Sequence, residues 1–214
     1  AETLAARLRD EWWLADEGLF ADVRASVQTV TAALQRIDGL ESDPGWQWMK
    51  PQARQAHRLF DEQVRARAAG PQEVDLPWLL RHWVVMCPME GGVATPEQAD
   101  RAFTRLLSAE FCNKWGMYLH PERQDVMSIN TGLLALALTR YGRVTDALTL
   151  VRQMAATLTL HMPGAISEAL PDQWCFLQLW SALGIISPLV EGVLGIAPDA
   201  GARALQVMPH LPDE

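Results

Sequence analysis

Cysteine is scarce in this sequence of 214 residues. The three cysteines, Cys87, Cys112 and Cys175, are odd in number, lie far apart and show no CxxC spacing. A disulfide framework needs paired cysteines and a structural zinc site usually draws on closely spaced ones, so we expect neither. Reduced, mostly buried thiols in a cytoplasmic protein fit this usage best.

Basic side chains are also in the minority, with 18 Lys and Arg against 26 Asp and Glu and a net charge of -8. No basic run interrupts this balance, so we expect no nucleic-acid partner. Neither an HExxH pair nor a phosphate-cradling glycine loop occurs, and we therefore predict no metal site and no cofactor. The five histidines lie apart, at His57, His82, His120, His161 and His210.

Long uninterrupted apolar runs are missing as well. The most apolar stretch, Trp174–Ala197, is broken by Pro188 and contains Gln178 and Glu191. A membrane-spanning helix needs about 20 predominantly apolar residues, so this stretch instead predicts a helix enclosed by other helices. Residues Ala1–Asp10 are amphipathic and charged, without the apolar core of a signal peptide. We therefore expect a cytoplasmic protein with no membrane partner.

Helical periodicity, in contrast, runs through nearly the whole sequence. Apolar residues from Phe20 to Leu34 predict one helix, which stops before Asp38-Gly39. Thr95 is a predicted N-cap, with Pro96 at the first helical position and a glutamine at the capping-box position, for a helix that reaches about residue 111. No alternating run reaches strand length, which predicts an all-α fold. Further helices are expected over about 1–13, 51–69, 130–140, 145–161 and from 174 onward.

The expected helices differ in their surfaces. Those near 97–110 and 145–160 are amphipathic, whereas those near 130–140 and 175–195 are apolar almost all round. The apolar helices start roughly 45 residues apart, a spacing typical of repeated helical hairpins. We expect paired hairpins in two layers, for which an α/α toroid and an α-solenoid both suffice. The chain is predicted to form one domain over 1–214, with the polar helix at about 51–70 as an exposed insertion.

One carboxylate stands in a loop bounded by proline and glycine. Glu168 lies within Met162–Asp172, directly before the apolar segment that carries Gln178 and Trp180. Loops held by rigid helices concentrate binding and catalytic groups, and an acid beside amide and aromatic side chains suits a sugar site. The alternative is a loop glutamate that caps the next helix. The nine tryptophans likewise either fill a helical core or line a carbohydrate cleft.

Several short motifs follow one another in a characteristic order. They are MSINTG at 127–132, YGR at 141–143, PGAISEALPD at 163–172, CFLQLWS at 175–181, GIAPDA at 195–200 and PHLP at 209–212. From about Met127 to Pro212, these motifs resemble the amylo-α-1,6-glucosidase domain of the glycogen-debranching type. The front half is less diagnostic, although EWW at 11–13 and EGLFAD at 17–22 look similar to the same family.

This resemblance implies a toroid of six helical hairpins, of which the chain is a partial (α/α)6 piece, with an inverting glucosidase site. By motif, Glu168 is the general base. Asp172, Gln178 and Trp180 are positions that contact or support the substrate, an α-glucan oligosaccharide. Trp174 stands where the family commonly has glycine, so a large ring is expected close to the site.

Inverting hydrolysis also requires a general acid, and no segment of this sequence matches the family's motif for that residue. Two carboxyl groups about 6.5–9.5 Å apart are needed, one protonated and one ionised. The family's acid belongs to an upstream motif, and Arg9-Asp10 is expected to be a surface pair on the first helix. Asp172 is either the second carboxyl group or a plain N-cap, and Asp22 is read as a surface charge near a turn.

These departures make the chain similar to the second half of a catalytic domain. We expect it to be inactive or weak alone, and to act as a homo-oligomer or with a missing N-terminal half. The alternative is a non-catalytic carbohydrate-binding or oligomerising helical module. An α-solenoid scaffold is a third reading, against which the loop around Glu168 argues.

Overall fold

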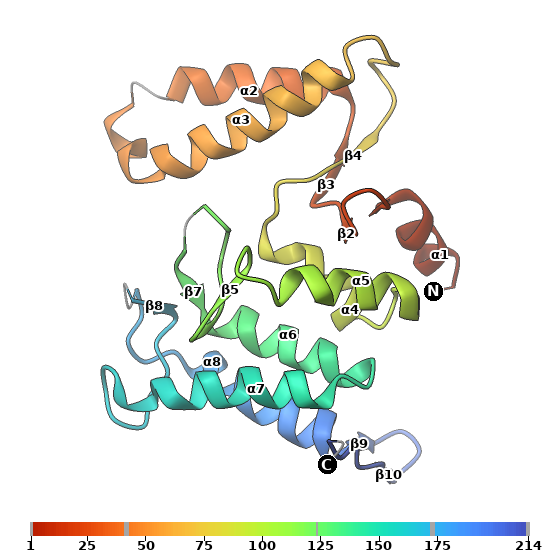
Figure 1. Cartoon of the computed structure of the whole chain (residues 1–214), viewed down its shortest axis with the longest axis vertical. Helices are drawn as coiled ribbons and strands as arrows, with labels where there is room; N and C mark the ends of the chain where they lie inside the picture. Colours follow the sequence, from red (N-terminus) through yellow and green to blue (C-terminus); the bar gives the residue numbers. More distant parts are fainter. Residues whose placement is uncertain (1, 41–42, 123, 172–173, 213–214) are drawn as a thin grey trace. The chain divides into compact units, whose positions relative to one another are not determined.

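The computed structural model describes residues 2–40, 43–122, 124–171 and 174–212 (Figure 1). The chain forms two compact units, Ala1–Val85 and Met86–Glu214. Helices dominate both units, as predicted, but short antiparallel strand pairs accompany them. None of the described helices is long and apolar enough to cross a membrane. The toroid and the single domain over 1–214 stay predictions.

In the first unit, two helices follow a set of short strands. The helix expected from Phe20 begins only at Val27, because Phe20 pairs with Trp13 and Val23 pairs with Trp78 in antiparallel strands. The elements in order are α1 (Glu2–Glu11), β1 (Trp13–Leu14), β2 (Leu19–Phe20), β3 (Val23–Ala25), α2 (Val27–Leu40), η1 (Pro44–Met49), α3 (Lys50–Ala66), β4 (Leu76–Trp78) and the 3₁₀ turn η2 (Trp83–Met86).

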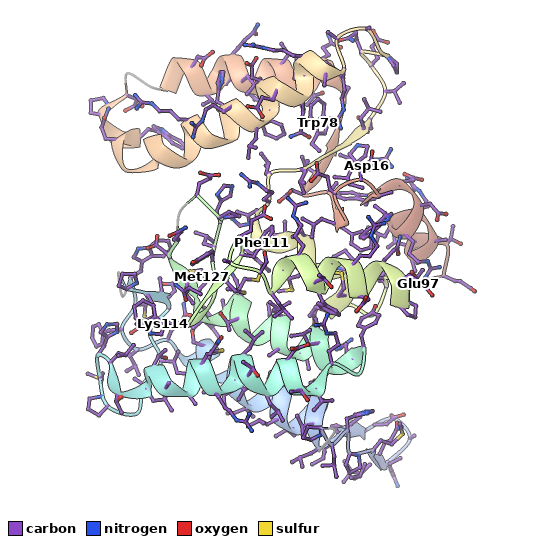
Figure 2. All side chains as sticks on the ribbon, in the orientation of Figure 1. Asp16, Trp78, Glu97, Phe111, Lys114 and Met127 are labelled. Carbon is purple, nitrogen blue, oxygen red and sulfur yellow. The ribbon has the colours of Figure 1, made fainter. Side chains whose placement is uncertain are left out.

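Trp78 is the centre of the core beneath α2 and α3. Its side chain is labelled in Figure 2. The indole ring is fully buried, and its Nε1–H donates to the Ala25 carbonyl at 2.8 Å. Val30 lies in the same cluster, and Phe60 of α3 meets the indole edge-on at 5.8 Å. The polar helix expected near 51–69 therefore forms, and it packs against α2 through its few apolar side chains.

The second unit is built around a buried helix, α6. Its Leu134, Ala135 and Leu138 are fully buried, and α4, α7 and α8 pack against it (Figure 1). The elements in order are α4 (Cys87–Glu90), α5 (Pro96–Leu106), β5 (Cys112–Asn113), β6 (Gly116–Met117), β7 (Val126–Met127), α6 (Ser128–Arg140), α7 (Val144–Ala155), η3 (Ala156–Thr159), β8 (Ala169–Leu170), α8 (Leu179–Ser187), the π-helical turn η4 (Pro188–Val193), β9 (Ile196–Asp199) and β10 (Ala204–Val207).

The capping box predicted for α5 is present. The Thr95 side chain accepts from the Gln98 N–H, and the Gln98 side chain accepts from the Thr95 N–H. The helix ends at Leu106, a few residues before the predicted limit. α6 and α7 likewise form within one or two residues of their predicted starts.

The prediction of an enclosed helix from Trp174 is wrong. α8 starts only at Leu179, and just one of its faces is covered. Ser181 and Gly184 are buried on that face, whereas Leu179 is 87% exposed and Trp180 62% exposed. An all-apolar sequence cannot tell a helix enclosed on every side from one that is half covered.

Candidate functional site

The loop that contains Glu168 is attached to the start of α6. β8 pairs with β7 in antiparallel register, with Ala169 opposite Met127. One residue further on, the Ser128 backbone N–H donates to the Glu168 carbonyl at 3.0 Å. This N–H belongs to the first turn of α6, where a helix has no internal acceptor for it. The start of a buried helix therefore fixes the position of Glu168.

A second segment of the same loop runs back along the first. The Glu168 N–H donates to the Cys175 carbonyl at 2.8 Å, and the Gln178 N–H donates to the Ile166 carbonyl at 3.2 Å. The predicted site residues Glu168 and Gln178 thus lie on two facing backbone segments. Both the N–H and the carbonyl of Glu168 are used, so its backbone has little freedom.

A pair of buried serines joins this loop to α8. The Ser128 hydroxyl donates to the Ser167 carbonyl at 2.7 Å. The Ser128 hydroxyl oxygen also lies 2.7 Å from the Ser181 hydroxyl oxygen. The Ser181 hydroxyl donates in turn to the Gln178 side-chain oxygen. His161 Nδ1 lies 2.9 Å from the Ser167 hydroxyl. The Gln178 side chain is therefore held by the Ser181 hydroxyl, and its role as a substrate contact stays a prediction.

The Glu168 carboxylate has no partner among the described residues. Its side chain is half-buried, and among the described residues neither a hydrogen bond nor an ion pair reaches it. A carboxylate that accepts no hydrogen bond from the protein keeps its lone pairs for water or a ligand. The side chain can therefore accept a proton from a bound water molecule, which is the act of a general base.

The remaining predicted site residues are two tryptophans and Asp172. Trp174 is 45% exposed just before α8, and Trp180 is 62% exposed on α8. Both indoles are therefore exposed to solvent. Asp172 lies outside the described residues, so its predicted role as substrate contact or second carboxyl group stays a prediction.

Asp22, in the first unit, is a carboxylate for which the prediction of a surface charge is wrong. Far from being a surface charge, it accepts backbone N–H bonds from Leu80 at 2.6 Å, Arg81 at 3.1 Å and His82 at 2.8 Å. Burial raises its pKa to about 6, and the three N–H donors oppose that rise. The donors lie about 60 residues along the chain, so no local pattern could reveal them.

An open hollow of about 700 Å³ lies in the second unit, between α6, η4 and β9. The charged or titratable side chains at its border are Arg140, Glu191 and His210. No local sequence pattern predicts this hollow, because its lining comes from segments up to about 70 residues apart along the chain. Nowhere in the described chain do three His, Cys, Asp or Glu side chains gather as a metal site would require.

Comparison with known proteins adds no family to this picture: the sequence matches no family model and no curated protein. The resemblance to debranching glucosidases therefore rests on the sequence motifs alone.

Proposed function

We propose that this chain carries the general-base half of an inverting α-glucosidase site of the debranching type, with Glu168 as the base. One observation supports this most. The Glu168 backbone is fixed through both its N–H and its carbonyl, while its carboxylate is without a partner among the described residues. A fixed backbone with an available carboxylate is what a pre-organised base needs.

In this proposal, Glu168 removes a proton from a water molecule as its oxygen attacks the anomeric carbon. The bond to the departing oxygen breaks, and that oxygen takes a proton from a second carboxyl group. Since no segment of this sequence matches the family's acid motif, we expect the chain alone to be inactive or weak on an α-glucan. General acid assistance contributes roughly 10²–10⁴-fold.

The substrate class follows from the same resemblance. The exposed indoles of Trp174 and Trp180 are available to stack on sugar rings of an α-glucan oligosaccharide. Gln178 supports the loop through Ser181, and Asp172 is proposed as a further substrate contact. The proposal includes a cytoplasmic location, which the three unpaired thiols of Cys87, Cys112 and Cys175 support.

An activated substrate tests the base without needing the acid. Fluoride leaves α-glucosyl fluoride with little protonation, so the missing acid matters less. We expect measurable release of fluoride with inversion to the β-sugar, and loss of at least about 100-fold in Glu168→Gln. Isomaltose and maltooligosaccharides should be turned over far more slowly or not at all.

The control is Glu97→Gln, which changes an exposed glutamate in the first turn of α5 and should leave fluoride release unchanged. Equal rates for the wild type and Glu168→Gln would remove Glu168 as the base. If the chain alone turned over isomaltose fully and Glu168→Gln abolished that turnover, Glu168 would stand as the general base. The claim that the chain lacks a general acid would then be refuted.

A non-catalytic carbohydrate-binding module is the second candidate. The exposure of Trp174 and Trp180 favours it, because stacking on sugar needs no carboxylate. Titration calorimetry with maltohexaose should then show binding that Glu168→Gln preserves and Trp180→Ala weakens. Absence of binding by the wild type would refute this candidate.

A further inference from the structure

The outward face of α8 is apolar and uncovered. Leu179, Leu183 and Ile186 lie at helical spacing, with exposed fractions of 87%, 52% and 53%. Trp180 extends the same face and is 62% exposed. Residues three, four and seven apart share one side of a helix, so the four side chains form a single stripe.

The stripe cannot be turned inward by rotating the helix. Gly184 on the covered face meets Gly132 of α6 so closely that a Cβ on Gly132 would lie 2.0 Å from the Gly184 Cα. Ser181, on the same covered face, is joined to Ser128 of α6 at 2.7 Å. These two contacts fix the rotation of α8, and the apolar side chains consequently stay outside.

The segment that directly precedes the helix also carries exposed apolar side chains. Trp174, Phe176 and Leu177 there are 45%, 53% and 60% exposed. Together with the α8 stripe they offer on the order of 800 Å² of apolar surface, about the contribution of one partner to a standard interface. The largest apolar patch of a typical monomer is roughly 300–600 Å².

We propose that this surface is the interface with a second copy of the chain, with α8 packed against α8 of the partner across a two-fold axis. Two features favour a second copy as the occupant. α8 carries no charged residue, so two copies meet without like charges despite the net charge of -8. The area also matches what each partner of a stable dimer buries.

This inference goes beyond the proposed function, and it uses two of the same side chains: the dimer covers Trp174 and Trp180, so only the monomer offers both indoles to a sugar. Light scattering or sedimentation equilibrium of the whole chain, from about 1 to 100 μM, should give the mass of a dimer. The double variant Leu183→Asp/Ile186→Asp should be monomeric over the same range, because it places four charges at the centre of the interface. Its circular dichroism should remain that of the wild type, since both side chains are exposed.

Leu4→Asp is the matched control, because Leu4 is a helical leucine 62% exposed in the first unit. It should stay dimeric. Should the double variant lose its helical signal, Leu179→Asn provides the same test at the most exposed position of the stripe. A monomeric wild type at 100 μM, or a dimer that persists in the folded variants, would overturn the proposal. Glu168→Gln should dimerise as the wild type does. Fluoride release therefore tests the general-base proposal, and the mass in solution tests the interface proposal separately.

Discussion

Gly132 of α6 and Gly184 of α8 bring two helix backbones into direct contact. A Cβ on Gly132 would lie 2.0 Å from the Gly184 Cα, a distance that no side-chain movement can relieve. We expect Gly132→Ala to lower the free energy of unfolding of the second unit by about 3 kcal/mol, because the helices must separate. Urea denaturation followed by circular dichroism measures this.

The control for that substitution is Gly201→Ala in the same unit. A Cβ at Gly201 would be 3.4 Å from its nearest neighbour, Asp199 Oδ1, which is ordinary contact. Its effect should stay within about 0.5 kcal/mol. If both alanine variants lost the same free energy of unfolding, the close approach of α6 and α8 would not be the cause of the loss in Gly132→Ala.

Local signals made much of this fold predictable. The start of α5 follows from four consecutive residues, and the positions of α6 and α7 follow from helical spacing and flanking turns. The loop around Glu168 was also recognisable, because its prolines and glycine lie next to the carboxylate in sequence. In each case the deciding atoms belong to residues close together along the chain.

Features that depend on distant residues were missed. Val23 fits a helical pattern as well as it fits the strand pairing that it adopts with Trp78, 55 residues later. The apolar sequence of α8 does not reveal which side meets α6, since that depends on Gly132 and Ser128 about 50 residues earlier. Asp22 gives no local hint of its three backbone donors at 80–82.

The capping box of α5 should make a measurable contribution to stability. Thr95→Ala removes the acceptor of the Gln98 N–H at the helix start. We expect a loss of about 1 kcal/mol in the free energy of unfolding. Thr104→Ala is the control, because the Thr104 hydroxyl bonds only back to the Asp100 carbonyl on an exposed turn. If both variants lost a similar free energy of unfolding, the Thr95 cap would not be a specific source of stability.

The buried Ser128 hydroxyl should control how tightly the candidate loop is held. Ser128→Ala removes the hydroxyl's hydrogen bonds to the Ser167 and Glu168 carbonyls and its contact with Ser181, but keeps the backbone N–H bond to the Glu168 carbonyl. Since one hydrogen bond is worth about 1 kcal/mol, the amides of Glu168 and Gln178 should exchange roughly five- to tenfold faster. Hydrogen exchange of the peptide over 164–180 measures this.

Thr149→Ala provides the comparison, because the Thr149 hydroxyl lies on the exposed side of α7 and bonds only to the Thr145 carbonyl. It should leave exchange over 164–180 unchanged. Unaltered exchange in Ser128→Ala would mean that the two backbone bonds of Glu168 hold the loop without the serine pair.

Glu168→Gln should leave stability almost unchanged. The carboxylate has no partner among the described residues, so its neutral replacement breaks no described contact. We expect a change within about 0.5 kcal/mol, measured by thermal denaturation. A loss of about 2 kcal/mol or more would point to a structural role for this side chain and weaken the general-base proposal.

Asp22 should make the stability of the first unit depend on pH. Burial raises its folded-state pKa to about 6, above the usual 3.8, so the folded state holds the proton more tightly than the unfolded state does. The resulting stabilisation is complete below about pH 4 and is lost as the pH rises through 6. The Asp22 contribution to the free energy of unfolding should therefore fall by roughly 2 kcal/mol between pH 4 and 7.

Asp22→Asn removes the titrating group, so the difference between its curve and that of the wild type isolates Asp22. Asp16→Asn, at an exposed carboxylate of the same unit, should keep the wild-type dependence. The three backbone donors act in the opposite direction to burial, because they favour the ionised form. If the wild type instead gains stability over the Asn variant between pH 4 and 7, the donors outweigh burial and Asp22 is held as a carboxylate.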